Sequence, residues 1–169
     1  MQKRITGYGF IALIIVGFVS LLSGCSPNST TPDVPLKVGE MSANVSGFGS
    51  FFASNAVASD NSSYDVLASL KDQNNNDSVA IRMTITKQVL TPYTIDVSQD
   101  DNSKITFCEL QSNGTCITYS ADKLTTGSSG QIKITSISPS LQGTFSGTLK
   151  QVGGLGSVTI TNGAFNAGF

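Results

Sequence analysis

Three cysteines are the residues best suited to covalent chemistry in this 169-residue chain. Cys25 stands alone at the end of an apolar run, whereas Cys108 and Cys116 form a closely spaced pair inside a region of alternating polar and apolar residues. A lone thiol after an apolar segment suits covalent modification, and an even pair in an oxidising compartment suits a disulfide. The sequence therefore predicts two separate uses of thiol chemistry.

The segment before Cys25 has the parts of a bacterial export signal. Lys3 and Arg4 give it a basic start, and residues 8–22 are mostly apolar. The ending Leu22-Ser23-Gly24-Cys25 resembles the lipobox of bacterial lipoproteins, where the signal is removed and the cysteine thiol is acylated, for example with palmitate. We therefore expect lipidation of Cys25 after removal of residues 1–24. The alternative is an uncleaved membrane anchor, although about 15–17 apolar residues make a short span.

Composition divides the rest of the chain into a tether and one domain. Residues 25–36 begin with the lipidated cysteine and contain three prolines among Ser, Thr and Asn, which predicts an extended, flexible tether. Residues 37–169 are long enough for a single domain with a substantial core. The residue after Cys25 is Ser26, whereas an aspartate at this position retains lipoproteins in the inner membrane of enteric bacteria. The outer membrane is therefore favoured, and the periplasmic and surface faces both stay open.

Short segments of period two fill residues 37–169. The clearest covers residues 79–86, where Ile81 and Ile85 should face the core and Arg82 and Thr84 should face water. About nine or ten such segments are separated by turn signals, and none has a helical period. The pattern predicts an antiparallel β-sandwich, with a small β-barrel as the alternative.

The spacing of Cys108 and Cys116 bears on their disulfide. Both lie on the face opposite the expected inward residues of their strands, so they project from the same side of a hairpin. A two-residue turn at Asn113-Gly114 would separate them. A five-residue loop over 110–114 would place them opposite each other and would still use Gly114 where a positive φ is needed.

Several strand and turn patterns resemble a family of uncharacterised bacterial lipoproteins, common among the Bacteroidota. The similar stretches are a first strand followed by an Ala-Ser-Asn step, a Gly-x-Ile-x-Ile stretch, a Gly-Thr-Phe strand and a closing Thr-Ile-Thr-Asn-Gly-x-Phe. They lie at residues 41–47, 52–55, 130–134, 143–145 and 159–165. The resemblance implies an all-β domain on a lipid anchor and transfers no catalytic or ligand motif.

Metal sites are poorly supported by the sequence. The run Asp72-x-Asn74-x-Asn76 imitates the start of a calcium loop, but Asp77 replaces its glycine and Met83 replaces its final glutamate. We therefore expect a hairpin loop there. The sequence Asp100-Asp101-Asn102 likewise predicts a turn.

Catalysis is also poorly supplied. The chain has no histidine, which removes the usual general base near neutral pH and the imidazole ligands of zinc. Its only glutamates are Glu40 and Glu109, and nothing pairs two carboxylates. We expect no enzyme and no cofactor. Removal of Lys3 and Arg4 leaves eight basic residues, spread singly, so no nucleic acid partner is expected.

Some residues could still serve recognition. Tyr64, Tyr93 and Tyr119 are expected in the core, whereas one of Phe51 and Phe52 should point outward. The triplet Asp77-Ser78-Val79 resembles an O-glycosylation acceptor of Bacteroidota.

Two functions remain open. The first is a non-catalytic structural or binding module at the cell envelope. It would bind a protein or a glycan, and its N-terminal lipid would attach it to the membrane. The alternative is a small β-barrel that carries an apolar ligand.

Overall fold

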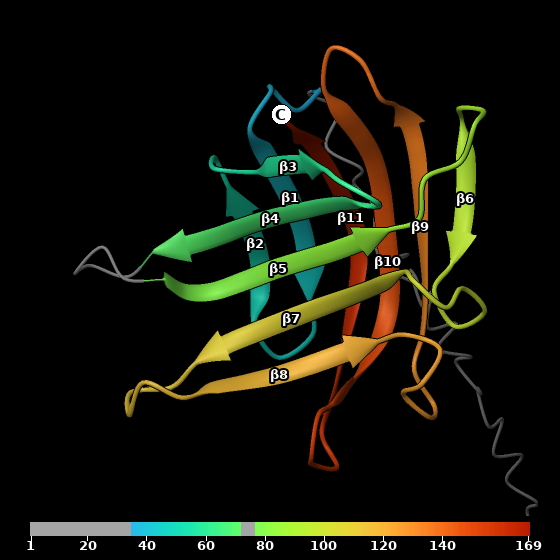
Figure 1. Ribbon diagram of the computed structural model, residues 1–169. Helices are drawn as coiled ribbons and strands as arrows, with labels where there is room; N and C mark the ends of the chain where they lie inside the picture. The colour runs from blue at the N-terminus through green and yellow to red at the C-terminus, as the bar shows by residue number, and fades with distance from the viewer. Residues whose placement is uncertain (1–34, 72–76) are drawn as a thin grey trace, which may run out of the picture.

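The computed structural model describes residues 35–71 and 77–169, which form an all-β domain (Figure 1). The strands are β1 (Glu40–Val45), β2 (Gly49–Ala53), β3 (Val57–Asp60), β4 (Tyr64–Lys71), β5 (Asp77–Ile85), β6 (Tyr93–Asp96), β7 (Lys104–Leu110), β8 (Cys116–Ala121), β9 (Ser129–Ser136), β10 (Leu141–Gln151) and β11 (Ser157–Ala167). No helix long and apolar enough to cross a membrane occurs in the part of the chain that the structure describes.

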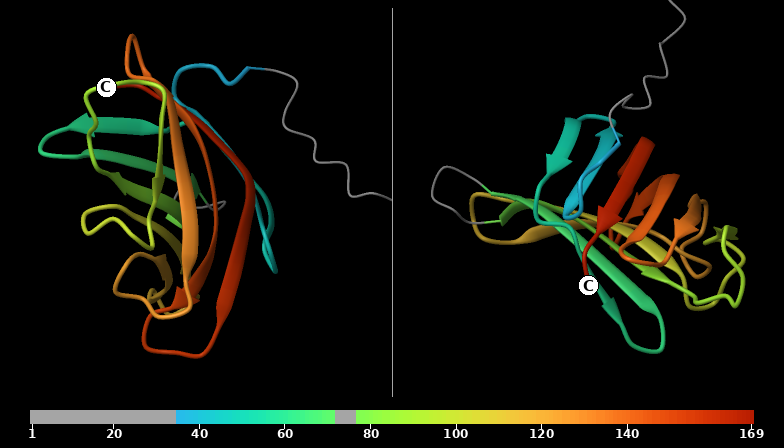
Figure 2. Two further views of the ribbon diagram at one scale, coloured as in Figure 1. Left: turned by 90° about the vertical axis from the view of Figure 1, so that its right-hand side faces the viewer. Right: turned by 90° about the horizontal axis from the view of Figure 1, so that it is seen from above.

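One antiparallel sheet curls until its two halves face each other. The first half, called the back layer here, has the order β2-β1-β11-β10-β9-β6, and the second half, the front layer, has the order β8-β7-β5-β4-β3. The strands of the two layers cross at a steep angle (Figures 1 and 2). The expected antiparallel all-β architecture is confirmed, in the form of a half-barrel whose layers pack as those of a sandwich do.

The two layers are joined at two corners. At one corner the end of β10 pairs with β8, with Gln151 opposite Tyr119. At the other corner β3 meets the residues after β11, where Val57 bridges Gly168 and the amide of Ala58 donates to the Gly168 carbonyl at 2.6 Å. Among the described strands, these joints leave edges at β2 and β6 of the back layer and along the remainder of β3 and β8.

The described chain has eleven strands, against the nine or ten that the sequence predicted. The count is higher because residues 51–58, which read in the sequence as one apolar segment, are divided between β2 in the back layer and β3 in the front layer. The crossing takes three residues. The Ala56 amide donates to the Gly39 carbonyl at 2.7 Å, and the Asn55 side chain accepts a hydrogen bond from the Ser69 amide at 3.0 Å.

Inward-facing side chains of both layers form one apolar core. Ile81 and Ile85 are completely buried, Arg82 is exposed and Thr84 is half-buried, so the predicted orientation of β5 is confirmed. The largest fully buried side chains come from both layers and fill the space between them; they include Met41, Phe51, Phe107, Met83, Leu141 and Leu149. The core therefore fixes which residues of each strand face outward.

Candidate functional site

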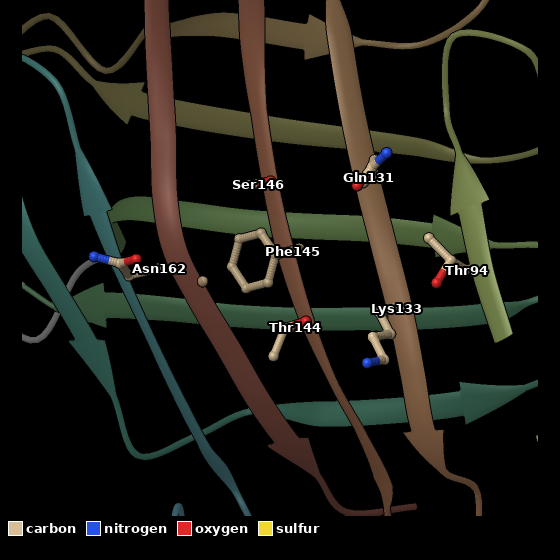
Figure 3. Close-up of a pocket in the computed structure, with 8 residues that line it drawn as sticks. Thr94, Gln131, Lys133, Thr144, Phe145, Ser146 and Asn162 are labelled. Carbon is tan, nitrogen blue, oxygen red and sulfur yellow. The ribbon is translucent and has the colours of Figure 1, made fainter. Parts of the chain in front are cut away.

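The outer surface of the back layer carries an open depression. It has a volume of about 390 Å³ and opens to solvent (Figure 3). Its lining comes from β6, β9, β10 and β11, namely Thr94, Gln131, Lys133, Thr144, Phe145, Ser146, Asn162 and Gly163. Most of these are hydroxyl or amide residues.

Strand register aligns these side chains in rows. Lys133 lies opposite Thr94 on one side and Thr144 on the other, whereas Gln131 lies opposite Ser146. Successive side chains of a strand point to opposite faces, and the inward face is taken by the core. Four strands therefore present their polar faces together, although each strand contributes only one or two polar side chains.

At one point the depression is lined by a glycine, Gly163, which packs closely against its neighbours. Gly163 lies opposite Phe145 in the β10–β11 ladder, and the rings of Phe145 and Phe165 pack 6.2 Å apart. Next to Gly163, Asn162 has a φ of 52°, in the left-handed region that asparagine tolerates better than most residues. The β10–β11 register shifts here, which is typical of a β-bulge.

Two smaller depressions of about 210 Å³ each adjoin the first and share residues with it. One shares Asn162 and is lined by Ser42, Ala43, Asn44, Ser50, Phe51 and Phe52. The other shares Thr94 and is lined by Gln88, Ile95, Asp96, Gln99 and Asp100. We call the three depressions together the outer track. It crosses the back layer from β2 to β6. Of the three phenylalanines that line it, Phe52 is the exposed one, at 53%.

The acidic groups at the β6 end are already held by the protein. Asp96 accepts hydrogen bonds from the Ser98 amide at 2.9 Å and from the Ser98 hydroxyl at 2.6 Å. Asp100 accepts from the Thr86 hydroxyl at 2.7 Å and from the Asn102 amide at 2.9 Å. Burial raises the pKa of Asp100, but these hydrogen bonds outweigh it and hold the pKa below its ordinary value. The residues therefore form the expected turn.

The structure supplies no metal cluster in its described ranges, where no three of His, Cys, Asp and Glu lie close enough together to hold an ion. Asp101 pairs instead with Lys123 at 2.7 Å. The calcium-like run at Asp72, Asn74 and Asn76 lies outside the described residues, as does Cys25.

Cys108 and Cys116 are brought together as predicted, with their sulfur atoms at bonding distance and their α-carbons 5.8 Å apart. The predicted register is wrong. Cys108 lies opposite Thr118 and Cys116 lies opposite Leu110, so the cysteines are diagonal neighbours.

The reason lies in the loop between β7 and β8. It has five residues, as expected, but it covers 111–115, one residue later than predicted. The Gln111 amide donates to the Thr115 carbonyl at 2.8 Å, and Asn113 accepts from the Thr115 amide at 2.9 Å. Gly114 has a φ of 80°, as predicted. Strand β7 consequently extends to Leu110, which moves the pairing by two residues.

The aromatic residues follow their predicted faces. Tyr64 and Tyr93 are 8% exposed, and Tyr119 is half-buried against Phe107 with ring centroids 6.1 Å apart. Phe51 is buried and Phe52 points outward. The Ser78 hydroxyl of the possible glycosylation triplet donates to the Leu70 carbonyl at 3.2 Å.

Sequence reasoning missed the outer track. Each polar residue in it also fits the solvated face of an ordinary strand, so the sequence alone does not mark a site. The Asn162-Gly163 pair was the one available signal, because this dipeptide marks an irregular backbone. No family model, curated protein or solved structure matches the chain.

Proposed function

We propose that the protein is a lipoprotein of the bacterial cell envelope, anchored through Cys25, whose β-domain is a non-catalytic binding module. The outer track carries this proposal. It is an open surface of hydroxyl and amide groups on a rigid sheet, flanked by one exposed aromatic side chain. Such groups hydrogen-bond to the hydroxyls of a glycan or to the backbone of a polypeptide.

The charge of the track supports a neutral ligand. Lys133 is its main cationic side chain, and Asp96 and Asp100 are engaged in their own turn. Recognition would therefore depend on hydrogen bonds and on packing against Phe52. We favour a glycan of the envelope as the ligand, with a protein as the alternative.

Anchoring is tested by metabolic labelling with an alkyne analogue of palmitate. The wild-type chain should be labelled and should sediment with membranes, and the outer membrane is the expected fraction. Cys25→Ala should lose the label and should be released or left unprocessed. An unlabelled wild-type protein would refute the lipoprotein proposal.

Binding is tested with a glycan array and with co-purification from native membranes. Thr144→Arg with Ser146→Arg fills the track with bulk and charge, whereas Ser59→Arg places the same group on exposed β3 of the front layer. Binding should fall in the first variant only. Equal binding by the wild type and both variants would show that the ligand lies elsewhere.

The runner-up, a carrier of an apolar ligand, needs space between the layers. Met41, Phe51 and Phe107 occupy that space with at most 1% of their surface exposed. A ligand would have to displace them. Mass spectrometry of an organic extract of the purified domain distinguishes the proposals, because a carrier would release a stoichiometric apolar compound.

A further inference from the structure

A cluster of apolar side chains is exposed where the chain enters the domain. Val38, Val57, Leu67 and Phe169 are 62%, 55%, 45% and 60% exposed. We call these four residues the apolar corner. They come from the segment before β1, from β3, from β4 and from the residue after Gly168, so the fold gathers them from distant parts of the sequence.

Backbone pairing makes the corner continuous. Val57 lies opposite Leu67 on β4 and bridges Gly168 on its other side. A β-carbon added to Gly168 would lie 3.3 Å from Val38, so the Val38 side chain covers this glycine. Phe169 follows at the border of the apolar corner, where its ring lies 6.2 Å from that of Tyr64, an inward-facing residue of β4. Contiguous exposed apolar residues mark an interaction site more often than scattered ones do.

The described part of the chain begins beside this corner. It begins at residue 35, and the carbonyl of Leu36 accepts a hydrogen bond from the Asn166 side chain at 2.8 Å. Ten residue steps separate Cys25 from Pro35, and a chain of that length spans at most about 35 Å. A lipid on Cys25 would therefore keep the corner within a short distance of the bilayer and at high effective concentration.

From this placement we infer that the apolar corner docks on the membrane surface that holds the lipid anchor. The inference rests on the proposed lipidation of Cys25. Cationic side chains lie on two sides of the apolar corner. Lys37 precedes Val38, and Arg82 lies opposite Leu67. Arg82 is paired with Asp65 at 3.3 Å and remains 57% exposed. Apolar residues flanked by cations suit the boundary between acyl chains and phosphate headgroups.

A second copy of the chain fits this surface less well. A standard protein interface buries about 800 Å² on each partner, and four partly covered side chains expose much less. A bilayer contact needs no such area, because the lipid anchor already holds the domain at the membrane and docking loses little further translational entropy. Docking would also hold the domain in one orientation on the membrane.

The chain has no tryptophan, so one introduced indole reports on its own surroundings. Leu67→Trp places it in the apolar corner. Leu155→Trp is the matched control, because Leu155 is fully exposed in the turn between β10 and β11, at the far end of the domain from β3 (Figure 1). Both full-length lipidated variants are reconstituted in vesicles of phosphatidylethanolamine and phosphatidylglycerol that contain a brominated phosphatidylcholine.

Docking predicts that Leu67→Trp loses most of its emission to the brominated lipid, whereas Leu155→Trp keeps its emission. Adding Val57→Asp should restore the emission of Leu67→Trp while both proteins still float with the vesicles. Flotation without selective quenching would overturn docking and leave the anchor intact. Failure to float would overturn the anchor and docking together. A blue shift that depends on protein concentration in detergent would instead identify a second copy as the occupant.

Discussion

Replacing Gly163 with alanine should destabilise the domain, because Phe145 already occupies the space that the new methyl group would need. An added β-carbon would lie 2.8 Å from two ring carbons of Phe145, and closer still to the Phe145 carbonyl oxygen. Phe145 cannot retreat easily. It lies in β10 between Ile132 of β9 and Gly163 of β11, so its backbone is paired on both sides.

The expected magnitude follows from two opposing effects. Overpacking in a closely fitted core costs about 1–3 kcal/mol. Alanine also restricts the unfolded chain, which returns about 0.4–1 kcal/mol. We expect a net loss of about 1–2 kcal/mol in the free energy of unfolding, which for a domain of this size lowers Tm by about 3–8 °C.

Urea unfolding followed by far-ultraviolet circular dichroism measures this loss without a tryptophan. The matched control is Thr144→Ala, next to Phe145 on the exposed face of β10, which should change the free energy by less than about 1 kcal/mol. If Gly163→Ala unfolded at the same urea concentration as the wild type, the tight approach of β10 and β11 inferred here would be refuted.

Three further outcomes are expected. Ile81→Ala should cost about 2–5 kcal/mol and Thr84→Ala less than about 1 in the same urea assay; equal losses would contradict the assigned faces of β5. Mass spectrometry of the unreduced mature protein should find Cys108 joined to Cys116, and reduction should cost roughly 2–3 kcal/mol for so short a loop; two thiols open to alkylation would exclude the bond. Burial raises the pKa of Asp122, but hydrogen bonds from neighbouring hydroxyl and amide groups outweigh it and hold the pKa below its ordinary value. The ionised Asp122 carboxylate therefore stabilises the folded domain at neutral pH, and this contribution is lost as pH falls through the lowered pKa. Asp122→Asn should be less stable than the wild type at pH 7 and nearly equal to it in acid.

The sequence predicted the parts of this fold that depend on alternation alone. In β5 the parity of Ile81 and Ile85 is sufficient, because one face of each strand must be buried. The same reasoning placed Cys108 and Cys116 on one side of their hairpin. It failed to fix their register, since that depended on whether the loop began at residue 110 or 111. In the structure the loop begins at 111, and the Thr115 amide donates a hydrogen bond to the Asn113 side chain within it.

The layers and the candidate site lay beyond such reasoning. Residues 51–58 have the composition of a single segment, and only the hydrogen bonds of Asn55 and Ala56 show where the chain changes layer. The outer track depends on the alignment of β6, β9, β10 and β11. Thr94 and Lys133 become neighbours through pairing that a single sequence does not reveal.

The pairing of the first strand with the last has a consequence for how the protein is made. Glu40 of β1 lies opposite Asn166 of β11, so the back layer joins residues from both ends of the domain. Contacts of such high sequence separation slow folding, because a long loop must close before they form. During synthesis β1 must wait for β11 to emerge, and the back layer stays incomplete until nearly the whole domain is available. Hairpins of consecutive strands such as β4–β5 and β7–β8 can form earlier, so the β1–β11 pairing is the step that closes the back layer after synthesis of the domain.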